Sequence, residues 1–171
     1  MITITGVQIK NALNKKRQAR DMWLSQWDES LVIFAGDDKI SPNDLATKVM
    51  QLEDEIVRLQ VIQARYNLAV SVDAEGGSLT MAYCVKVVSA AGRMSKLWKE
   101  AAQGEKKDRY SSRLTNERDK DKEYAKPAIS KAEALNRFES AEEFASSIRE
   151  AIATGNTKPV EFEDSVGDLF R

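Results

Sequence analysis

The most constraining feature of this sequence is an apolar line from Leu45 to Val70 in which the spacing alternates between four residues and three. Its members are Leu45, Val49, Leu52, Ile56, Leu59, Gln63, Tyr66 and Val70. This spacing keeps one side of an α-helix apolar along its length and is typical of a coiled-coil seam. Because Ser41 and Pro42 form a strong N-terminal cap with Asp44 behind them, we expect one helix over residues 42–72.

The same helix carries a second apolar line, made of Met50, Val57, Val61, Ala64 and Leu68. A simple two-stranded coiled coil would place polar residues there. A helix that is apolar on two sides needs neighbours on both, so the pattern predicts a place inside a helical bundle or at the core of a homo-oligomer. Gln63 is the polar exception in the first line, and two explanations stay open: it fixes the register of packing, or it lies at an exposed helix end.

Two further helices are expected beside the long one. Thr5 is a good cap for a helix over residues 6–29, and Ser78 is one for a helix over residues 79–103. The latter repeats the four-three spacing at Cys84, Val87, Ala91, Met94, Trp98 and Ala101. Only a short turn containing Gly76 and Gly77 separates residues 42–72 from residues 79–103. We therefore expect these two helices to form an antiparallel hairpin, and residues 1–104 to form a three-helix bundle.

The remaining third of the chain is expected to be less compact. Residues 105–129 alternate acids and bases, which predicts an exposed connector. Residues 130–171 contain two capping boxes, Ser130 with Glu133 and Ser140 with Glu143, and so predict two short helices. Residues 160–162 could add a strand, and the acidic end from residue 164 is expected to be loosely held. The predicted fold class is all-α, with a minor strand at most.

The composition argues against most catalytic chemistry. The 171 residues contain no histidine and one cysteine, Cys84, which removes histidine-based nucleophile pairs and histidine-ligated metal sites. Cys84 lies in an apolar run and is expected to be a small buried hydrophobe. The acidic run Glu53-Asp54-Glu55 points its carboxylates in different directions around a helix. We therefore expect no enzyme activity and no cofactor, while a ligand or metal held between subunits stays open.

The first predicted helix contains a basic cluster, Lys15, Lys16, Arg17 and Arg20. We favour the interpretation that this cluster is a solvated face or pairs with acidic residues of the next helix. The alternative is a phosphate-contacting patch, which would make the protein a nucleic-acid-binding protein. The formal net charge of −1 argues against that alternative.

The location expected from the sequence is the cytoplasm. The longest apolar run, Leu31 to Ala35, is far shorter than the roughly 20 residues needed to span a bilayer. The first residues also lack the apolar stretch of a signal peptide.

Several short motifs resemble a septicolysin-like family of bacterial helical proteins of unknown function. The matching segments are Arg65-Tyr66-Asn67, Gly77-Ser78-Leu79-Thr80 with Ala82, Arg109-Tyr110-Ser111, and a late helix with Ile152 and Asn156 followed by Glu161. Thr157 departs from the pattern, which favours an apolar residue or tryptophan there. The resemblance implies an elongated helical subunit of a symmetric homo-oligomer with no established activity. Together with the two apolar lines, it predicts a homo-oligomeric structural or interaction module.

Overall fold

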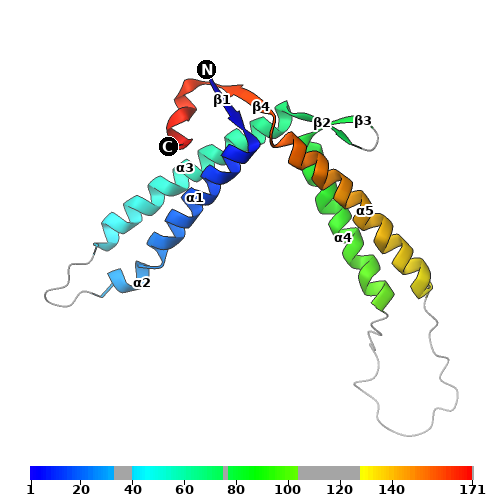
Figure 1. Cartoon of the computed structure of the whole chain (residues 1–171). Helices are drawn as coiled ribbons and strands as arrows, with labels where there is room; N and C mark the ends of the chain where they lie inside the picture. Colours follow the sequence, from blue (N-terminus) through cyan, green and yellow to red (C-terminus); the bar gives the residue numbers. More distant parts are fainter. Residues whose placement is uncertain (33–39, 75–76, 104–127, 171) are drawn as a thin grey trace, which may run out of the picture. The chain divides into compact units, whose positions relative to one another are not determined.

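The computed structural model describes residues 1–32, 40–74, 77–103 and 128–170, and this part of the chain is mainly α-helical with two small antiparallel strand pairs (Figure 1). The elements are β1 (Ile2–Thr5), α1 (Gly6–Leu24), α2 (Trp27–Ser30), α3 (Pro42–Ala69), β2 (Ser71–Ala74), β3 (Gly77–Thr80), α4 (Met81–Gln103), α5 (Lys131–Gly155), β4 (Pro159–Phe162) and η1 (Asp164–Phe170), the last being a 3-10 helix. This confirms the predicted fold class.

The N-terminal strand leads directly into a capped helix. β1 pairs antiparallel with β4, with Ile2 opposite Phe162 and Thr5 opposite Pro159, so the strand predicted near residue 160 is confirmed. Thr5 caps α1: its hydroxyl accepts from the Gln8 backbone amide at 3.3 Å, and the Gln8 side chain accepts from the Thr5 amide at 2.8 Å. The helix is shorter than expected, because a turn after Leu24 separates it from α2.

The long helix α3 begins where its sequence predicts and finds a different partner. The Ser41 hydroxyl accepts from the Asp44 amide at 3.2 Å, which confirms the predicted cap. α3 packs on α1, and the two helices lie side by side in Figure 1. The apolar seam of α3 is therefore buried by α1 and not by the helix over residues 79–103, with which a hairpin was expected.

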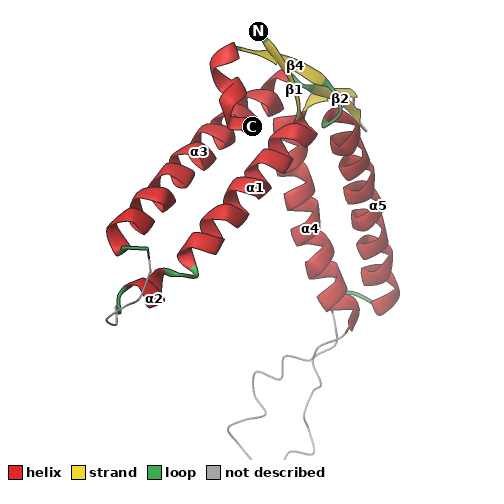
Figure 2. Cartoon of the chain, turned by 60° about the vertical axis from the view of Figure 1, so that its left-hand side comes forward, coloured by secondary structure: helices red, strands yellow, loops and turns green. Residues whose placement is uncertain are grey.

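The segment between α3 and α4 is a β-hairpin, drawn in yellow in Figure 2. β2 pairs with β3, with Val72 opposite Leu79, and Gly77 adopts a positive φ of 121°, a conformation that favours glycine. The cap predicted at Ser78 is therefore wrong, because Ser78 lies in a strand. Thr80 takes that role, since its hydroxyl accepts from the Tyr83 amide at 3.3 Å.

The C-terminal region contains one long helix where two short ones were predicted. Ser130 does cap α5, accepting from the Glu133 amide at 3.1 Å. Ser140, the second predicted cap, lies inside the helix. The reason lies in packing that is continuous along α5, where Ala134, Ala145 and Ile148 are all buried. Tertiary contacts thus override the local preference of serine for a helix start.

The end of the chain is held in place, which corrects the expectation of a loose acidic tail. Leu169 in η1 is only 4% exposed. The N-terminal amine also lies 2.8 Å from the Asp164 carboxylate. η1 contacts both β1 and α1, so the two ends of the chain meet in one structure.

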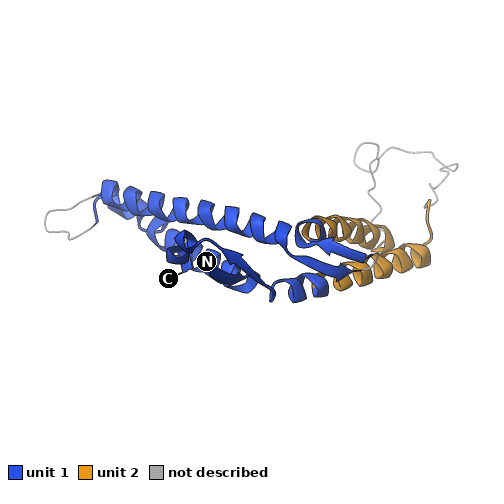
Figure 3. Cartoon of the chain, turned by 90° about the horizontal axis from the view of Figure 1, so that it is seen from above, with its two compact units in different colours: residues 1–84, 150–171 blue, residues 85–149 orange. Residues whose placement is uncertain are grey.

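The chain divides into two compact units, coloured in Figure 3. Unit 1 comprises Met1–Cys84 and Glu150–Arg171, and unit 2 comprises Val85–Arg149. In unit 2, α4 lies beside α5: the Ser95 hydroxyl donates to Glu142, and the Arg137 guanidinium lies 4.9 Å from the centroid of the Trp98 ring. This division differs from the predicted bundle over residues 1–104 and small segment over residues 130–171. The predicted connector, residues 105–129, lies almost wholly outside the described residues.

Candidate interaction surface

The apolar seam of α3 forms the core of unit 1. Its members Leu45, Ile56, Leu59, Tyr66 and Val70 are all buried, while Val49, Leu52 and Gln63 are half-buried. Ile62, which the four-three pattern does not include, is buried with them. The prediction that this line is core is therefore confirmed, and its neighbour is α1.

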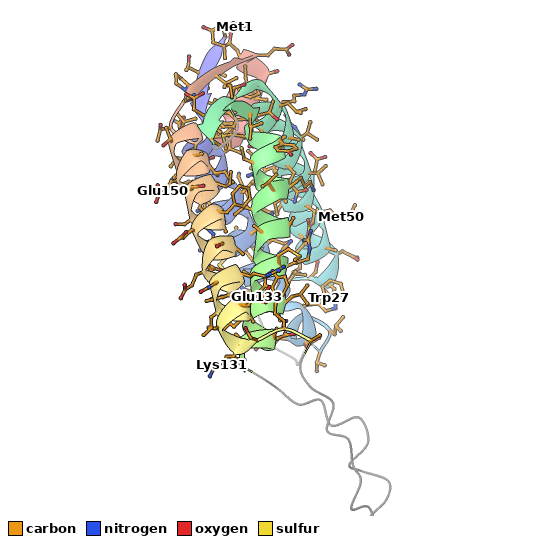
Figure 4. The ribbon with its side chains drawn as sticks, turned by 90° about the vertical axis from the view of Figure 1, so that its right-hand side faces the viewer. Met1, Trp27, Met50, Lys131, Glu133 and Glu150 are labelled. Carbon is orange, nitrogen blue, oxygen red and sulfur yellow. The ribbon has the colours of Figure 1, made fainter. Side chains whose placement is uncertain are left out.

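The second line of α3 is exposed among the described residues. Met50, which Figure 4 labels, is 72% exposed, and Leu68 is 66% exposed. Between them Val57 is 54% exposed, Val61 is 48% exposed, and Ala64 is exposed as well. At about 100° per residue, these positions lie on the side of the helix opposite the buried seam. We call them the α3 outer stripe.

Polar and charged residues border the α3 outer stripe. Asp54, Arg58 and Arg65 lie along one side and Glu53, Gln60 and Asn67 along the other. An open surface hollow beside Met50 is lined by Thr47, Gln51, Asp54, Glu55 and Arg58. An apolar centre with a polar rim is the usual composition of a protein–protein contact surface.

The basic cluster of α1 meets the acidic run of α3. Lys16 Nζ lies 2.7 Å from Glu55 Oε2, an atom with no hydrogen-bond partner of standard geometry among the described residues. Arg20 Nη1 lies 3.1 Å from Glu53 Oε1. Lys15 and Arg17 are exposed on α1. The favoured interpretation, pairing with the next helix, is therefore confirmed for Lys16 and Arg20.

Two further interactions complete this polar side of the α1–α3 contact. Hydrogen bonds to Asp21 and then to Glu53 raise the pKa of the Arg20 guanidinium above its ordinary value, so it stays charged. Lys48 Nζ lies 4.2 Å from the centroid of the Trp23 ring, a cation–π contact. The contacts of Arg20 occupy a cation that the nucleic-acid alternative would use.

The junction where α3, α5 and β4 meet depends on one buried tyrosine. The Tyr66 hydroxyl lies 2.8 Å from the Gly155 carbonyl oxygen and 2.7 Å from that of Lys158. A Cβ atom at Gly6 would lie 2.8 Å from the Tyr66 ring and would clash with the Asn156 side chain. Sequence reasoning did not identify Gly6, whose only signal is a glycine at the first position of a helix.

The motifs that resemble the septicolysin-like family lie in different environments. Tyr66 and Asn156 meet at the junction, whereas Arg65 is exposed and Asn67 is half-buried. Arg109, Tyr110 and Ser111 lie outside the described residues. The described motif residues therefore do not form a common polar site.

The described residues contain no group of three or more cysteine or acidic side chains placed to hold a metal ion. No helix in the described ranges is both long enough and apolar enough to cross a membrane. Cys84 is buried, as expected for a small hydrophobe. The α3 outer stripe is therefore the strongest candidate for a functional surface.

Comparison with known proteins supports the fold alone. No protein-family model and no curated protein sequence matches the chain. A solved structure of a functionally unknown conserved protein from Corynebacterium diphtheriae is similar, with a TM-score of 0.70 at 15% sequence identity. The match covers 94% of this chain and all of that protein's chain. The arrangement of elements therefore recurs in a natural protein whose sequence is very different.

Proposed function

We propose that the protein is a homo-oligomeric association module, without a catalytic role, and that the α3 outer stripe binds a second copy of the chain. The observation that carries the proposal is the exposed line from Met50 to Leu68 on a helix whose opposite side packs on α1. Single exposed apolar residues are common, but an apolar line with a polar rim along several turns is typical of a contact surface.

The magnitude of the hydrophobic contribution supports association and also limits it. Full burial of one valine, leucine or methionine side chain contributes about 1.5–3 kcal/mol. The four large residues of the stripe are already partly covered, so two copies together would gain on the order of 7–14 kcal/mol. Association costs about 4–15 kcal/mol in lost freedom. The stripe alone would thus give a marginal complex, and a stable oligomer requires further contact area.

The proposal is tested by Val61→Asp, a change at the centre of the stripe. Val61 is 48% exposed, so the substitution leaves the core of the subunit intact. In a symmetric contact it removes two valine side chains and buries two carboxylates, a loss of about 4 kcal/mol or more. That loss of free energy corresponds to a dissociation constant that is roughly 1000-fold higher. Ile56→Asp would be a poor test, because Ile56 is 3% exposed and a charge there would unfold the subunit.

Light scattering coupled to size-exclusion chromatography gives the measurement. We expect the wild type to have a mass that is a multiple of 19.2 kDa, and Val61→Asp to have the monomer mass. Asn14→Asp is the control: Asn14 is exposed on α1, outside the α3 outer stripe and its rim, so the added charge there should keep the oligomer. A wild-type protein that stays monomeric at micromolar concentration would contradict the proposal.

We do not propose nucleic-acid binding. Its four candidate residues include Lys16 and Arg20, which pair with Glu55 and Glu53 of the same chain. A phosphate would have to displace those carboxylates before it could use both cations.

A further inference from the structure

A second apolar line is exposed on α4. It consists of Tyr83, Val87, Ala90, Met94, Leu97 and Ala101, again with alternating spacings of four and three residues. Tyr83 is 56% exposed, Met94 is 45% exposed and Leu97 is 57% exposed. Ala90 and Ala101 are exposed too, and Val87 is half-buried. We call these residues the α4 outer stripe.

The α4 outer stripe is distinct from the buried side of the same helix. The buried and half-buried side comprises Met81, Cys84, Val88, Ala91, Ser95, Trp98 and Ala102. Ser95 and Trp98, both on this side, contact α5. The sequence pattern mixed these two sides, since it grouped Cys84 and Ala91, which are buried, with Met94 and Ala101, which are exposed.

The outer stripes of α3 and α4 match in length, and their spacing matches except at the seven-residue gap between Met50 and Val57. Each extends over about 27 Å of helix at 1.5 Å per residue, from Met50 to Leu68 and from Tyr83 to Ala101. Laid antiparallel with full overlap, each of the five residues of the α3 outer stripe lies opposite a residue of the α4 outer stripe, while Leu97 lies opposite Asp54, a residue of the polar rim. In three of the five paired layers a small side chain faces a larger one, as for Ala64 with Val87 and Met50 with Ala101.

We propose that the α3 outer stripe of one copy packs antiparallel against the α4 outer stripe of a second copy. In this register Leu68 faces Tyr83 of the partner subunit, and Val57 faces Met94 of the partner subunit. The inference rests on the proposed function and specifies the surface that the α3 outer stripe binds. A two-fold axis brings both stripes of each copy into use, which supplies the additional area that the α3 stripe alone lacks.

The bordering charges favour the antiparallel orientation. A parallel arrangement with full overlap would place Arg58 opposite Lys86 of the partner subunit and Arg65 opposite Arg93 of the partner subunit. These are two like-charge pairs at the rim. The antiparallel arrangement instead places Lys86 and Arg93 of α4 opposite neutral α3 residues, Asn67 and Gln60.

One like-charge pair remains in the antiparallel arrangement. It brings Glu53 near Glu100 of the partner subunit. Arg20 of the same chain, 3.1 Å from Glu53, offsets this repulsion. The antiparallel orientation therefore has the lower electrostatic cost, because it leaves one like-charge pair where the parallel orientation has two.

The structure of unit 1 favours pairing of the α3 outer stripe with the α4 outer stripe of a second copy over pairing of the two stripes within the same chain. The Met81 amide donates to the Val70 carbonyl at 2.9 Å, so the first layer of a seam within one chain would join Leu68 to Tyr83. Both residues belong to unit 1. They are nevertheless 66% and 56% exposed, so this layer is open within the chain.

Disulfide cross-linking between two differently tagged, co-expressed chains tests the pairing. Met50→Cys in one chain and Ala101→Cys in the other should give a covalent mixed dimer under mild oxidation. Met50→Cys with Tyr83→Cys is the matched control, because the antiparallel register places these positions about 27 Å apart. Wild-type chains, which contain only the buried Cys84, should give no cross-link. Circular dichroism checks that each variant retains its helices.

Each other outcome overturns a defined part of the inference. A cross-link with Tyr83→Cys and none with Ala101→Cys would reverse the orientation. Met50→Cys chains linked to each other would show that two α3 stripes meet. A chain with both Met50→Cys and Ala101→Cys that forms an internal disulfide as a monomer would show closure within one chain. If no pair cross-links while Val61→Asp still dissociates the oligomer, the pairing fails and the proposed function survives.

Discussion

Replacing Tyr66 with phenylalanine tests whether the junction depends on a single hydroxyl group. Tyr66 is fully buried, and its hydroxyl lies 2.8 Å from the Gly155 oxygen and 2.7 Å from the Lys158 oxygen. This group therefore connects α3 to the end of α5 and to the turn before β4. Tyr66→Phe keeps the ring and its packing, and removes only the polar contact.

The expected cost follows from what the two carbonyl groups retain. The Gly155 oxygen still accepts from the Lys158 amide at 3.0 Å, so it keeps a partner. The Lys158 oxygen loses the hydroxyl. A net hydrogen bond contributes about 1 kcal/mol, and leaving a buried acceptor without a donor costs about 1–3 kcal/mol. We therefore expect Tyr66→Phe to lower the free energy of unfolding by about 2 kcal/mol.

Urea unfolding followed by circular dichroism measures this change. With a slope of about 2 kcal/mol per molar urea, the midpoint should fall by roughly 1 M. The protein concentration must be the same in all samples, because association would shift the midpoint. A midpoint equal to that of the wild type would refute the reasoning.

Two further predictions concern packing and charge. Gly155→Ala should destabilise by about 1–3 kcal/mol, because the new Cβ would lie 2.6 Å from Val72 Cγ1, whereas Gly92→Ala, which meets open space within a helix, should stabilise by about 0.5–1 kcal/mol. Opposite signs in thermal unfolding would confirm the close approach at Gly155, and equal signs would contradict it. A double-mutant cycle with Lys16→Met and Glu55→Gln should give a coupling energy of about 1 kcal/mol that shrinks at high salt; a coupling of zero would show that the 2.7 Å ion pair contributes nothing.

Local features of the fold were predictable from the sequence because their causes are local. Thr5, Ser41 and Ser130 each accept a backbone hydrogen bond three residues later, so their capping role depends only on neighbouring residues. The apolar spacing of α3 likewise identified the helix and its buried seam. Thr80 was missed as a cap because Ser78, two residues earlier, offered an equally good local signal.

Long-range pairings were not predictable in this way. β1 and β4 are separated by most of the chain, and the sequence of neither four-residue strand indicates which segment it pairs with. The β2–β3 hairpin and the uninterrupted α5 likewise depend on packing that overrides local preference. In the β2–β3 hairpin and in the interior of α5, the strand or helix conformation is stable only when the segments that pack against it are present.

The candidate surface is the clearest example of a long-range contact that the sequence could not predict. The sequence by itself determined that α3 is a long helix with two apolar lines, because side-chain direction follows from helical periodicity. Only the tertiary structure decided that α1 covers the line from Leu45 to Val70 and leaves the line from Met50 to Leu68 exposed. Periodicity fixes which residues share a face, but the neighbour of that face depends on contacts between segments far apart in the chain.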